Sequence, residues 1–277
     1  MKQLLLLVIV SLVGVPTAAR AQDDDPDLDL SVSQPDFTLA ALPTTLRMPR
    51  FKSSFRVTHR FGRSLGAGDF GDLAGDLFGL DNGAQIGLEY RFGFMRGLQG
   101  GVRRTSDKTI EFFGQYSVLQ QGDSPVAVGI LASIDGTNNF QDDEENNVES
   151  SHSPALGVAI SRTLGNMGAV YLEPIWVNNS NPAPDALVND NDSMLLGLGA
   201  RIRVRPTVYL IGEAIPRIAG YDPGVTQTTF GIEKRAGGHS FQLNVSNAFG
   251  TTMGQVARGG FTNDDWYLGF SISRKFF

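Results

Sequence analysis

Apolar and polar residues alternate along most of the chain that follows residue 50. In the first such stretch, from Phe51 to Phe61, most odd positions are apolar and every even position from Lys52 to Arg60 is polar. The stretch from Ala84 to Phe94 repeats the pattern in a second register. A period of two residues is typical of a β-strand with one apolar and one polar face. The pattern therefore predicts a sheet whose two faces meet different environments.

The alternation recurs along the chain and gives about 12 predicted strands. The weakest covers Leu98–Arg104, and the last runs from Trp266 to Ile272. Most are close to the 9–11 residues with which a tilted strand crosses a bilayer. We therefore predict an all-β protein, a closed antiparallel transmembrane β-barrel of about 12 strands that occupies residues 46–277.

The lengths of the connections favour a barrel over a soluble sandwich. Bacterial barrels keep both termini in the periplasm, with short turns on that side and long loops outside. Connections after even-numbered strands are short, and one connection after an odd-numbered strand, Thr105–Lys108, is also short. Within the first long loop, Gly68–Leu80 is expected to form a short helix folded over the mouth of the barrel. The long connections all follow odd-numbered strands and cover residues 63–83, 135–153, 178–192 and 248–263.

Both ends of the sequence indicate export to the outer membrane. Residues 1–21 combine a charged start, an apolar run and an Ala19-Arg-Ala21 motif, which is typical of a cleaved signal peptide. The acidic stretch that follows predicts a flexible periplasmic tail over residues 22–45. At the other end, Phe276 shares the apolar face and Phe277 the polar face of the last strand. Either the last residue leaves the strand, or the barrel assembly machinery recognises Phe276.

Composition narrows the class further. The chain of 277 residues contains 33 glycines and no cysteine, so a disulfide, a thiolate metal site and a lipid-modified cysteine are excluded. The mean hydropathy of −0.09 is unlike that of a helical membrane protein and fits a barrel whose strands each turn one side to a polar interior. The net charge of −6 argues against nucleic acid as a partner.

Several segments between Leu46 and the C-terminus share a resemblance. They are Thr58-His-Arg-Phe61, Phe78-Gly-Leu-Asp-Asn-Gly83, Glu89-Tyr-Arg-Phe-Gly93, Arg104-Thr-Ser-Asp-Lys-Thr109, Gly237-Gly-His-Ser-Phe-Gln242, Asn247 with Gly250-Thr-Thr252, and Leu268-Gly-Phe270 with Ile272-Ser-Arg-Lys-Phe276. Jointly they resemble a bacterial outer-membrane β-barrel family catalogued as a domain of unknown function. The resemblance implies a barrel fold and an outer-membrane location, and it brings no catalytic residues.

The polar faces of the predicted strands carry charges of both signs. In a water-filled lumen, opposed charges select ions or small polar solutes. In a narrow barrel, the same charges pair and fill the interior. Two functions therefore stay open: a narrow porin-like pore for small polar solutes or ions, and a closed barrel that acts as a binding or scaffold component of the outer membrane. The candidate lumen or constriction residues are Arg56, Arg60, Glu89, Arg91, Glu111, Glu173, Arg201, Arg203, Glu213 and Glu233.

The sequence offers few candidates for metal binding or catalysis. His59 and His239 fall on apolar faces near strand ends, where packing is favoured over metal binding. The acidic runs 142–145 and 190–192 are favoured as solvated loops over a calcium site. Ser240 follows His239 directly, and neighbours in a strand face opposite sides. We therefore expect no enzyme activity and no cofactor. The expected partners are outer-membrane lipids, lipopolysaccharide, the barrel assembly machinery and a small polar solute.

Overall fold

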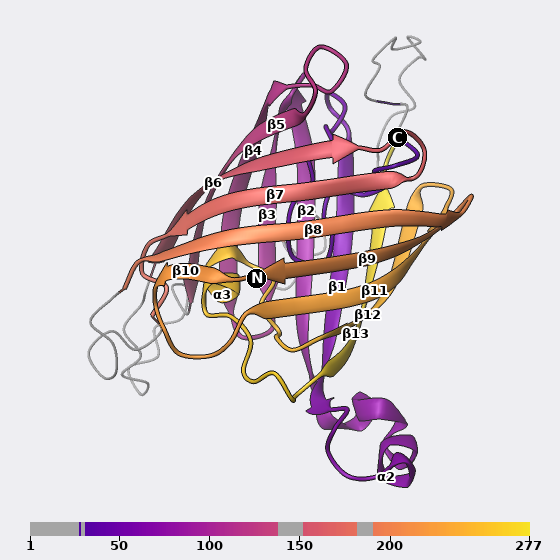
Figure 1. Cartoon of the computed structure of the whole chain (residues 1–277), viewed down its shortest axis with the longest axis vertical. Coiled ribbons are helices and arrows are strands. Elements are labelled where there is room, and N and C mark those ends of the chain that lie inside the picture. Colours follow the sequence, from indigo (N-terminus) through magenta and orange to yellow (C-terminus); the bar gives the residue numbers. More distant parts are fainter. Residues whose placement is uncertain (1–27, 29–30, 138–151, 182–190) are drawn as a thin grey trace, which may run out of the picture.

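The chain folds into one antiparallel sheet that closes on itself (Figure 1). The computed structural model describes residues 28, 31–137, 152–181 and 191–277. Each strand pairs with its neighbour, and the last strand pairs with the first. The strands are β1 (Ser53–Ser64), β2 (Ala84–Met95), β3 (Leu98–Thr105), β4 (Thr109–Leu119), β5 (Ala127–Thr137), β6 (His152–Thr163), β7 (Gly168–Val177), β8 (Ser193–Arg205), β9 (Val208–Ile215), β10 (Arg217–Gly220), β11 (Gln227–Ala236), β12 (His239–Ser246) and β13 (Tyr267–Lys275).

The predicted barrel of about 12 strands is confirmed. The sheet has 13 strands by hydrogen bonding, but β10 pairs only with β8 and follows directly on β9. Pro216 separates the two because proline has no N–H to give to a ladder. Its carbonyl oxygen still accepts from the N–H of Leu196 at 3.0 Å. The short β10 is thus the far end of β9 beyond a proline, and the closed barrel has 12 strands.

The two faces of the sheet are divided as the alternation predicted. On β1, Arg56 and Arg60 are buried inside the barrel, whereas Phe55 between its polar neighbours is exposed on the outside. Large apolar side chains are exposed on most of the strands, among them Ile130 and Leu243. A face of this kind suits lipid, since apolar side chains gain nothing by exposure to water. None of the helices in the described part of the chain has the length and hydropathy to cross a bilayer.

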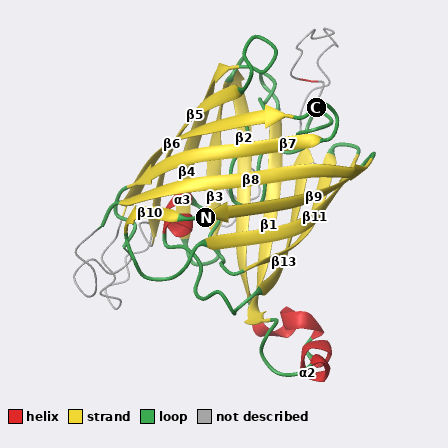
Figure 2. Cartoon of the chain, in the orientation of Figure 1, coloured by secondary structure: helices red, strands yellow, loops and turns green. Residues whose placement is uncertain are grey.

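In the residues that the structure describes, helices are short and lie outside the strands of the barrel (Figure 2). The first loop contains α2 (Phe70–Gly75) and the 3₁₀ helix η2 (Leu77–Asn82), so the predicted helix is confirmed. Its predicted position over the mouth is wrong, because it projects away from the barrel and Phe70 is 73% exposed (Figure 1). An ion pair between Arg63 and Asp76 ties it to the end of β1. A different helix, α3 (Met253–Ala257) in the last loop, lies within the barrel.

The N-terminal region differs from the predicted flexible tail. Residues 33–45 are all buried, and they lie inside the barrel. The signal peptide predicted at residues 1–21 lies outside the described residues. At the other end, β13 stops at Lys275, and Phe276 still donates its N–H to the carbonyl oxygen of Ser53 at 2.9 Å. Phe276 is 50% exposed on the outer side, in agreement with its predicted face.

A charge on the outer face of β5 tests the face assignment. Ile130 is 50% exposed and pairs with Val158, which lies near the middle of β6. We expect Ile130→Arg to destabilise the folded barrel by about 2–4 kcal/mol, because an arginine at the membrane midplane is poorly solvated. Denaturant titration of the protein refolded in lipid vesicles measures the change, with Ile130→Leu as the matched control. A stability equal to that of the control would show that Ile130 does not face lipid.

Candidate functional site

The lumen is filled from one end by the chain's own N-terminal segment. The hydroxyl of Ser33 donates to the carbonyl oxygen of Gly165, in the short turn between β6 and β7, at 2.8 Å. From there the chain runs into the barrel, reverses, and returns to the start of β1. We call residues 36–45 the plug hairpin. Every residue of the plug hairpin is buried.

Backbone pairing makes this segment a hairpin. The N–H of Leu39 donates to the carbonyl oxygen of Leu42 at 2.7 Å, and the N–H of Thr44 donates to that of Phe37 at 2.8 Å. The turn itself consists of Ala40-Ala41, whose small side chains fit the closed interior. These bonds use only part of the hydrogen-bonding capacity of the backbone. The remaining N–H and C=O groups at the turn need partners from the barrel wall.

Glu213 of β9 supplies the acceptor for the turn. Its carboxylate accepts from the N–H of Ala40 at 3.0 Å, of Ala41 at 2.9 Å and of Leu42 at 3.2 Å. Three successive N–H groups that converge on one carboxylate form an anion-binding nest. Such charge-assisted bonds are about twice as strong as neutral ones. Glu213 therefore fixes the position of the hairpin tip in the lumen.

Donors from the barrel wall satisfy the carbonyl groups of the same turn. The carbonyl oxygens of residues 38, 39 and 40 accept from Arg201 Nη2 at 3.0 Å, Gln242 Nε2 at 2.8 Å and Arg56 Nη2 at 2.9 Å, respectively. These donors come from β8, β12 and β1. The tip is thus held from several sides of the barrel, and almost entirely through its main chain.

The arms of the plug hairpin are anchored nearer the end of the barrel. On the entering arm, Asp36 accepts from the hydroxyl of Ser273 at 2.6 Å and lies 3.6 Å from the ammonium group of Lys275. On the returning arm, Gln115 donates to the carbonyl oxygen of Thr44 at 2.8 Å. Side chains of β13 and β4 therefore extend the contact along both arms.

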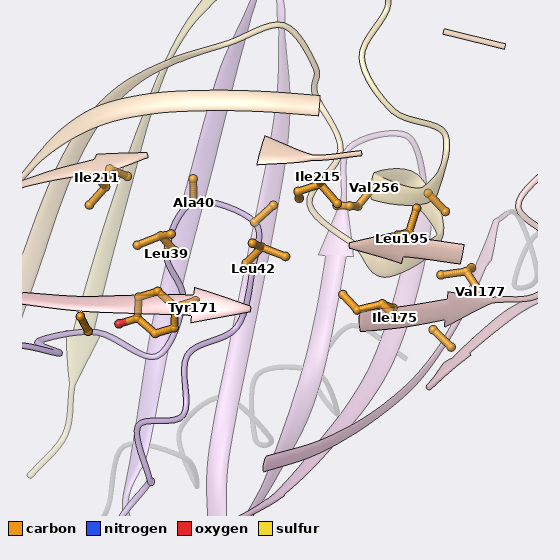
Figure 3. Packing of buried hydrophobic residues seen from close by; sticks show 14 residues of the cluster. Leu39, Ala40, Leu42, Tyr171, Ile175, Val177, Leu195, Ile211, Ile215 and Val256 are labelled. Carbon is orange, nitrogen blue, oxygen red and sulfur yellow. The ribbon is translucent and has the colours of Figure 1, made fainter. Parts of the chain in front are cut away.

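Two glycines of β8 make room for the apolar side chains of the tip. A Cβ atom at Gly199 would lie 2.6 Å from Leu39 Cδ2, and one at Gly197 would lie 2.8 Å from Leu42 Cδ2. We call Gly197 and Gly199 the glycine strip. Tyr171 lines the strip beside Leu39 (Figure 3). The two leucines therefore pack on bare backbone, and any larger residue in the strip would displace them.

Buried ion pairs join the strands of the lumen wall. Glu89 accepts from Arg91 at 2.9 Å and from Arg103 at 2.5 Å, and Arg103 also donates to Glu111 at 2.8 Å. Opposite them, Arg201 pairs with Glu233 at 2.9 Å, with both side chains fully buried. Removal of one partner from a buried pair leaves an uncompensated charge and is strongly destabilising. These pairs stiffen the wall on both sides of the plug hairpin.

The last loop occupies the other end of the lumen. The N–H of Met253 donates to Glu111 at 2.9 Å, and the N–H of Gly254 donates to Asp135 at 3.1 Å. Thr252 caps the helix and also donates its hydroxyl to Asp135 at 2.6 Å. Val256 of α3 packs in the same buried cluster as the hairpin leucines (Figure 3). The sequence therefore closes its lumen with two segments, one at each end of the chain.

Little space remains between the two segments. A cavity of about 30 Å³ is lined by residues of both, including Pro43 and Met253, and by Arg103 and Glu111 of the wall. A volume of this size holds about one or two water molecules. In this conformation, the part of the lumen between the plug hairpin and α3 is too small for a solute larger than water.

The structure places nine of the ten candidate residues together. Arg203 is the exception, since it lies near the end of β8, is partly exposed and donates to the carbonyl oxygen of Pro206 at 3.2 Å. The role of the others in solute passage stays a prediction. The nine that are buried in the lumen are Arg56, Arg60, Glu89, Arg91, Glu111, Glu173, Arg201, Glu213 and Glu233.

Glu173 differs from the other lumen carboxylates. It is fully buried, and neither of its oxygens has a hydrogen-bond partner among the residues that the structure describes. It lies beside the glycine strip, where its Cβ is 3.1 Å from the position that a Cβ at Gly197 would take. The plug hairpin fills the space next to Glu173 with the side chain of Leu42 and offers it no donor.

Sequence reasoning missed the plug hairpin and its neutral partners. The available signal was the mostly apolar run from Phe37 to Leu42, which lies between Pro35 and Pro43 within the predicted periplasmic tail. Gln242 lies on the polar face of its strand, but a neutral side chain in that pattern does not stand out. Asp135 was assigned to a loop, whereas β5 continues through it to Thr137.

The remaining candidate side chains lie apart from the lumen contacts. His59 stacks on Phe270 at the outer surface with a centroid distance of 4.9 Å. Ser240 is buried inside, while His239 before it stacks on Phe241 outside. Within the described ranges, no group of three or more His, Cys, Asp or Glu residues is placed to hold a metal ion. The acidic run 142–145 lies outside those ranges.

The closed sheet, the apolar exterior and the charged interior together define a porin-like β-barrel of the bacterial outer membrane. The chain belongs to the family described as Membrane bound beta barrel domain (DUF5777), which matches residues 37–276. The match includes every barrel strand and nearly all of the plug hairpin. Comparison with curated proteins gives no match.

Solved structures with a similar fold include two porins. The NanC porin is 9% identical, with a TM-score of 0.53, and the match covers 81% of this chain and 100% of that one. The KdgM porin, solved in complex with disordered oligogalacturonate, is also 9% identical, with a TM-score of 0.50 over 81% of this chain and 99% of that one. Outer membrane phospholipase A from Escherichia coli has a TM-score of 0.48 at 10% identity, over 88% and 98%. These likenesses concern the fold alone.

Thiol labelling tests the hold of Glu213 on the hairpin. The chain has no cysteine, so Ala41→Cys introduces a single thiol at the buried tip. We expect this thiol to react slowly with a water-soluble maleimide, and about tenfold faster when Glu213→Gln is added, because the bonds to a charged acceptor are lost. Ala74→Cys, at an exposed position of α2, is the matched control and should react fast in both backgrounds. Equal rates at position 41 with and without Glu213→Gln would contradict the assigned role.

Proposed function

We propose that this protein is an outer-membrane channel for small polar solutes or ions, closed at rest by its plug hairpin and open when the hairpin leaves the lumen. The observation that carries the proposal is the way in which the tip is held. Among the described residues, the tip itself has no strand pairing with the wall. Instead, its backbone is bound by lumen side chains, chiefly Glu213, Arg56 and Arg201.

The energy of this attachment suits a closed channel with rare openings. Six backbone groups of the tip are bonded to the wall, three N–H and three C=O. A net contribution of about 0.5–1.5 kcal/mol for a hydrogen bond, and more with a charged partner, gives several kcal/mol for these six bonds. The contacts of the two arms and the burial of Leu39 and Leu42 add to this. Removal of a barrel strand would break two whole ladders. Release of the hairpin is therefore the less costly way to open the lumen.

The wall that release would expose has the character of a selective pore. Glu213 and Glu173 lie on one side, and Arg56 and Arg60 come from β1 on another. Opposed charges across a narrow lumen favour ions and polar solutes over apolar ones. Outward apolar side chains and inward charges are also the arrangement of porin-like barrels.

A closed barrel that serves as a scaffold is the second candidate. The observation that favours it is the helical first loop, which projects from the barrel and leaves Phe70 and Leu77 exposed at 73% and 59% (Figure 1). Phe70 also contacts Phe78 edge to face at a centroid distance of 6.2 Å, and a cluster of exposed apolar side chains is typical of a contact surface. An enzymatic function is not proposed, since Ser240 and His239 face opposite sides of the sheet.

Conductance in a planar bilayer distinguishes the two candidates. The unaltered full-length protein should give rare, brief openings. Ala41→Pro should give frequent, stable steps, because proline removes one of the N–H groups bound by Glu213 and is disfavoured at the second central position of such a turn. Ala41→Ser keeps the N–H and is the matched control, with openings as rare as those of the unaltered protein.

The scaffold function is favoured if the Ala41→Pro barrel folds but gives no conductance. Heat-modifiable migration on a gel shows that the barrel is folded. The thiol assay at position 41 cannot be combined with this variant, so Ala40→Cys, at a buried position with a small side chain, reports release instead. A folded barrel with a reactive thiol at position 40 and no conductance would overturn the channel proposal.

A further inference from the structure

The plug hairpin shows what kind of molecule the lumen wall binds. Its tip is held through main-chain groups, with the N–H groups on Glu213 and the C=O groups on Arg56, Arg201 and Gln242. None of these contacts depends on the identity of a hairpin side chain. A wall that pairs a carboxylate with amide N–H groups, and guanidinium or amide groups with carbonyls, is matched to a peptide backbone.

The glycine strip adds a preference for aliphatic side chains. Leu39 and Leu42 occupy the space above Gly199 and Gly197, where side-chain methyl groups approach backbone atoms directly. A sugar or another hydroxyl-rich solute would leave this apolar space unfilled.

Glu173 is a hydrogen-bond acceptor in the site that the plug hairpin does not use. A fully buried carboxylate without a hydrogen bond is costly, because it has lost its water and gained no donor. The hairpin cannot satisfy it, since the chain there continues through Pro43, which has no N–H. A separate short peptide would bring a free amino terminus, whose ammonium group is the complement of a buried carboxylate.

We propose that the wall around the glycine strip is a binding site for short peptides with aliphatic side chains and a free amino terminus, with Glu213 on the amide N–H groups, Arg56, Arg201 and Gln242 on the carbonyls, and Glu173 on the ammonium group. This inference rests on the proposed function, because a peptide reaches the site only when the plug hairpin has left it. The plug hairpin then acts as an internal competitor for the site.

The test uses the full-length protein with the hairpin released. The probe is the tetrapeptide Leu-Ala-Ala-Leu with an amidated carboxyl end, which repeats residues 39–42, and the binding measurement is isothermal titration in detergent. The amide is needed because Leu42 lies beside Glu173, where a free C-terminal carboxylate would repel that residue. In the hairpin the N–H of Leu39 donates to the carbonyl oxygen of Leu42 at 2.7 Å, so the amino end of the peptide comes to the same place. Ala41→Pro should bind the peptide and the unaltered protein should not, because an attached hairpin competes at an effective concentration in the millimolar range. Leu39→Asp together with Leu42→Asp releases the hairpin by expelling it from the glycine strip and serves as a second background.

Acetylation of the peptide isolates the role of Glu173. In either released background, we expect the N-acetylated peptide to bind about tenfold more weakly than the free one, since a charged hydrogen bond is lost. Glu173→Gln should weaken binding of the free peptide by a similar factor and leave the affinity for the acetylated peptide unchanged. Sucrose, a solute of comparable size without amide groups, should not bind. Equal affinity for the free and acetylated peptides, or no binding in both released backgrounds, would overturn the inference.

Conductance separates this result from the proposed function. A released variant that conducts ions but neither binds nor is blocked by the peptide supports the channel and overturns the peptide site. A released variant that binds the peptide but does not conduct supports the site and overturns the channel. Failure of both measurements overturns both.

Discussion

The pairing of buried charges inside the barrel is the constraint on which the rest of the structure depends. Charged side chains on the inner wall of a 12-stranded barrel must have either water or partners, since an ion without either is several kcal/mol less stable in a low-dielectric interior. Here the wall supplies some partners, as in the Arg201–Glu233 pair. Others come from segments that enter the lumen, and Glu173 is left without a hydrogen-bond partner among the described residues. Glu213 is satisfied by three N–H groups of the plug hairpin, and Asp135 by the start of α3.

The same constraint links the two closures. Arg103 donates to Glu89 and Glu111 on the wall and also to the carbonyl oxygen of Thr251 in the last loop. Glu111 in turn accepts from the N–H of Met253. The wall and the last loop are therefore parts of one network, and the hairpin joins the other side of the lumen through Arg56 and Arg201. A change in any one buried charge alters the partners of the next, because members of a hydrogen-bonded network are not independent.

The barrel was predictable from sequence because strand alternation is a local signal. The period of two identified the strands and their faces, and nine of ten inward charges lie where that pattern placed them. The plug hairpin was not predictable in the same way. Residues 37–42 are too few to show a period, and their partners, such as Glu213 and Gln242, are distant in the sequence. The acidic residues Asp23–Asp27 predict a flexible tail, but the segment that follows them differs in composition and folds into the lumen.

The positions of the helical loops also could not be predicted from a local sequence pattern. The apolar residues of the first loop indicated a helix but not its direction, and the structure turns Phe70 outward. The helix that enters the lumen, α3, has only five residues, and its capping box of Thr252 and Gln255 is a weak signal in a long loop. Its position is set by Glu111 and Asp135, which accept its first N–H groups. Hydrogen bonds to buried carboxylates of the barrel wall therefore determine which loop enters the lumen.

Attachment through the main chain has a consequence for how such a closure opens. A plug held by interlocking side chains would require repacking of the wall before it moved. The tip of the plug hairpin rests on the bare backbone of Gly197 and Gly199, and its polar contacts are hydrogen bonds that water or another amide can replace one at a time. In the release that we propose, ion pairs within the wall, such as Arg103–Glu89, keep both partners. Glu213, Arg56 and Arg201 lose their hairpin partners, and an exchangeable occupant with amide groups would replace them.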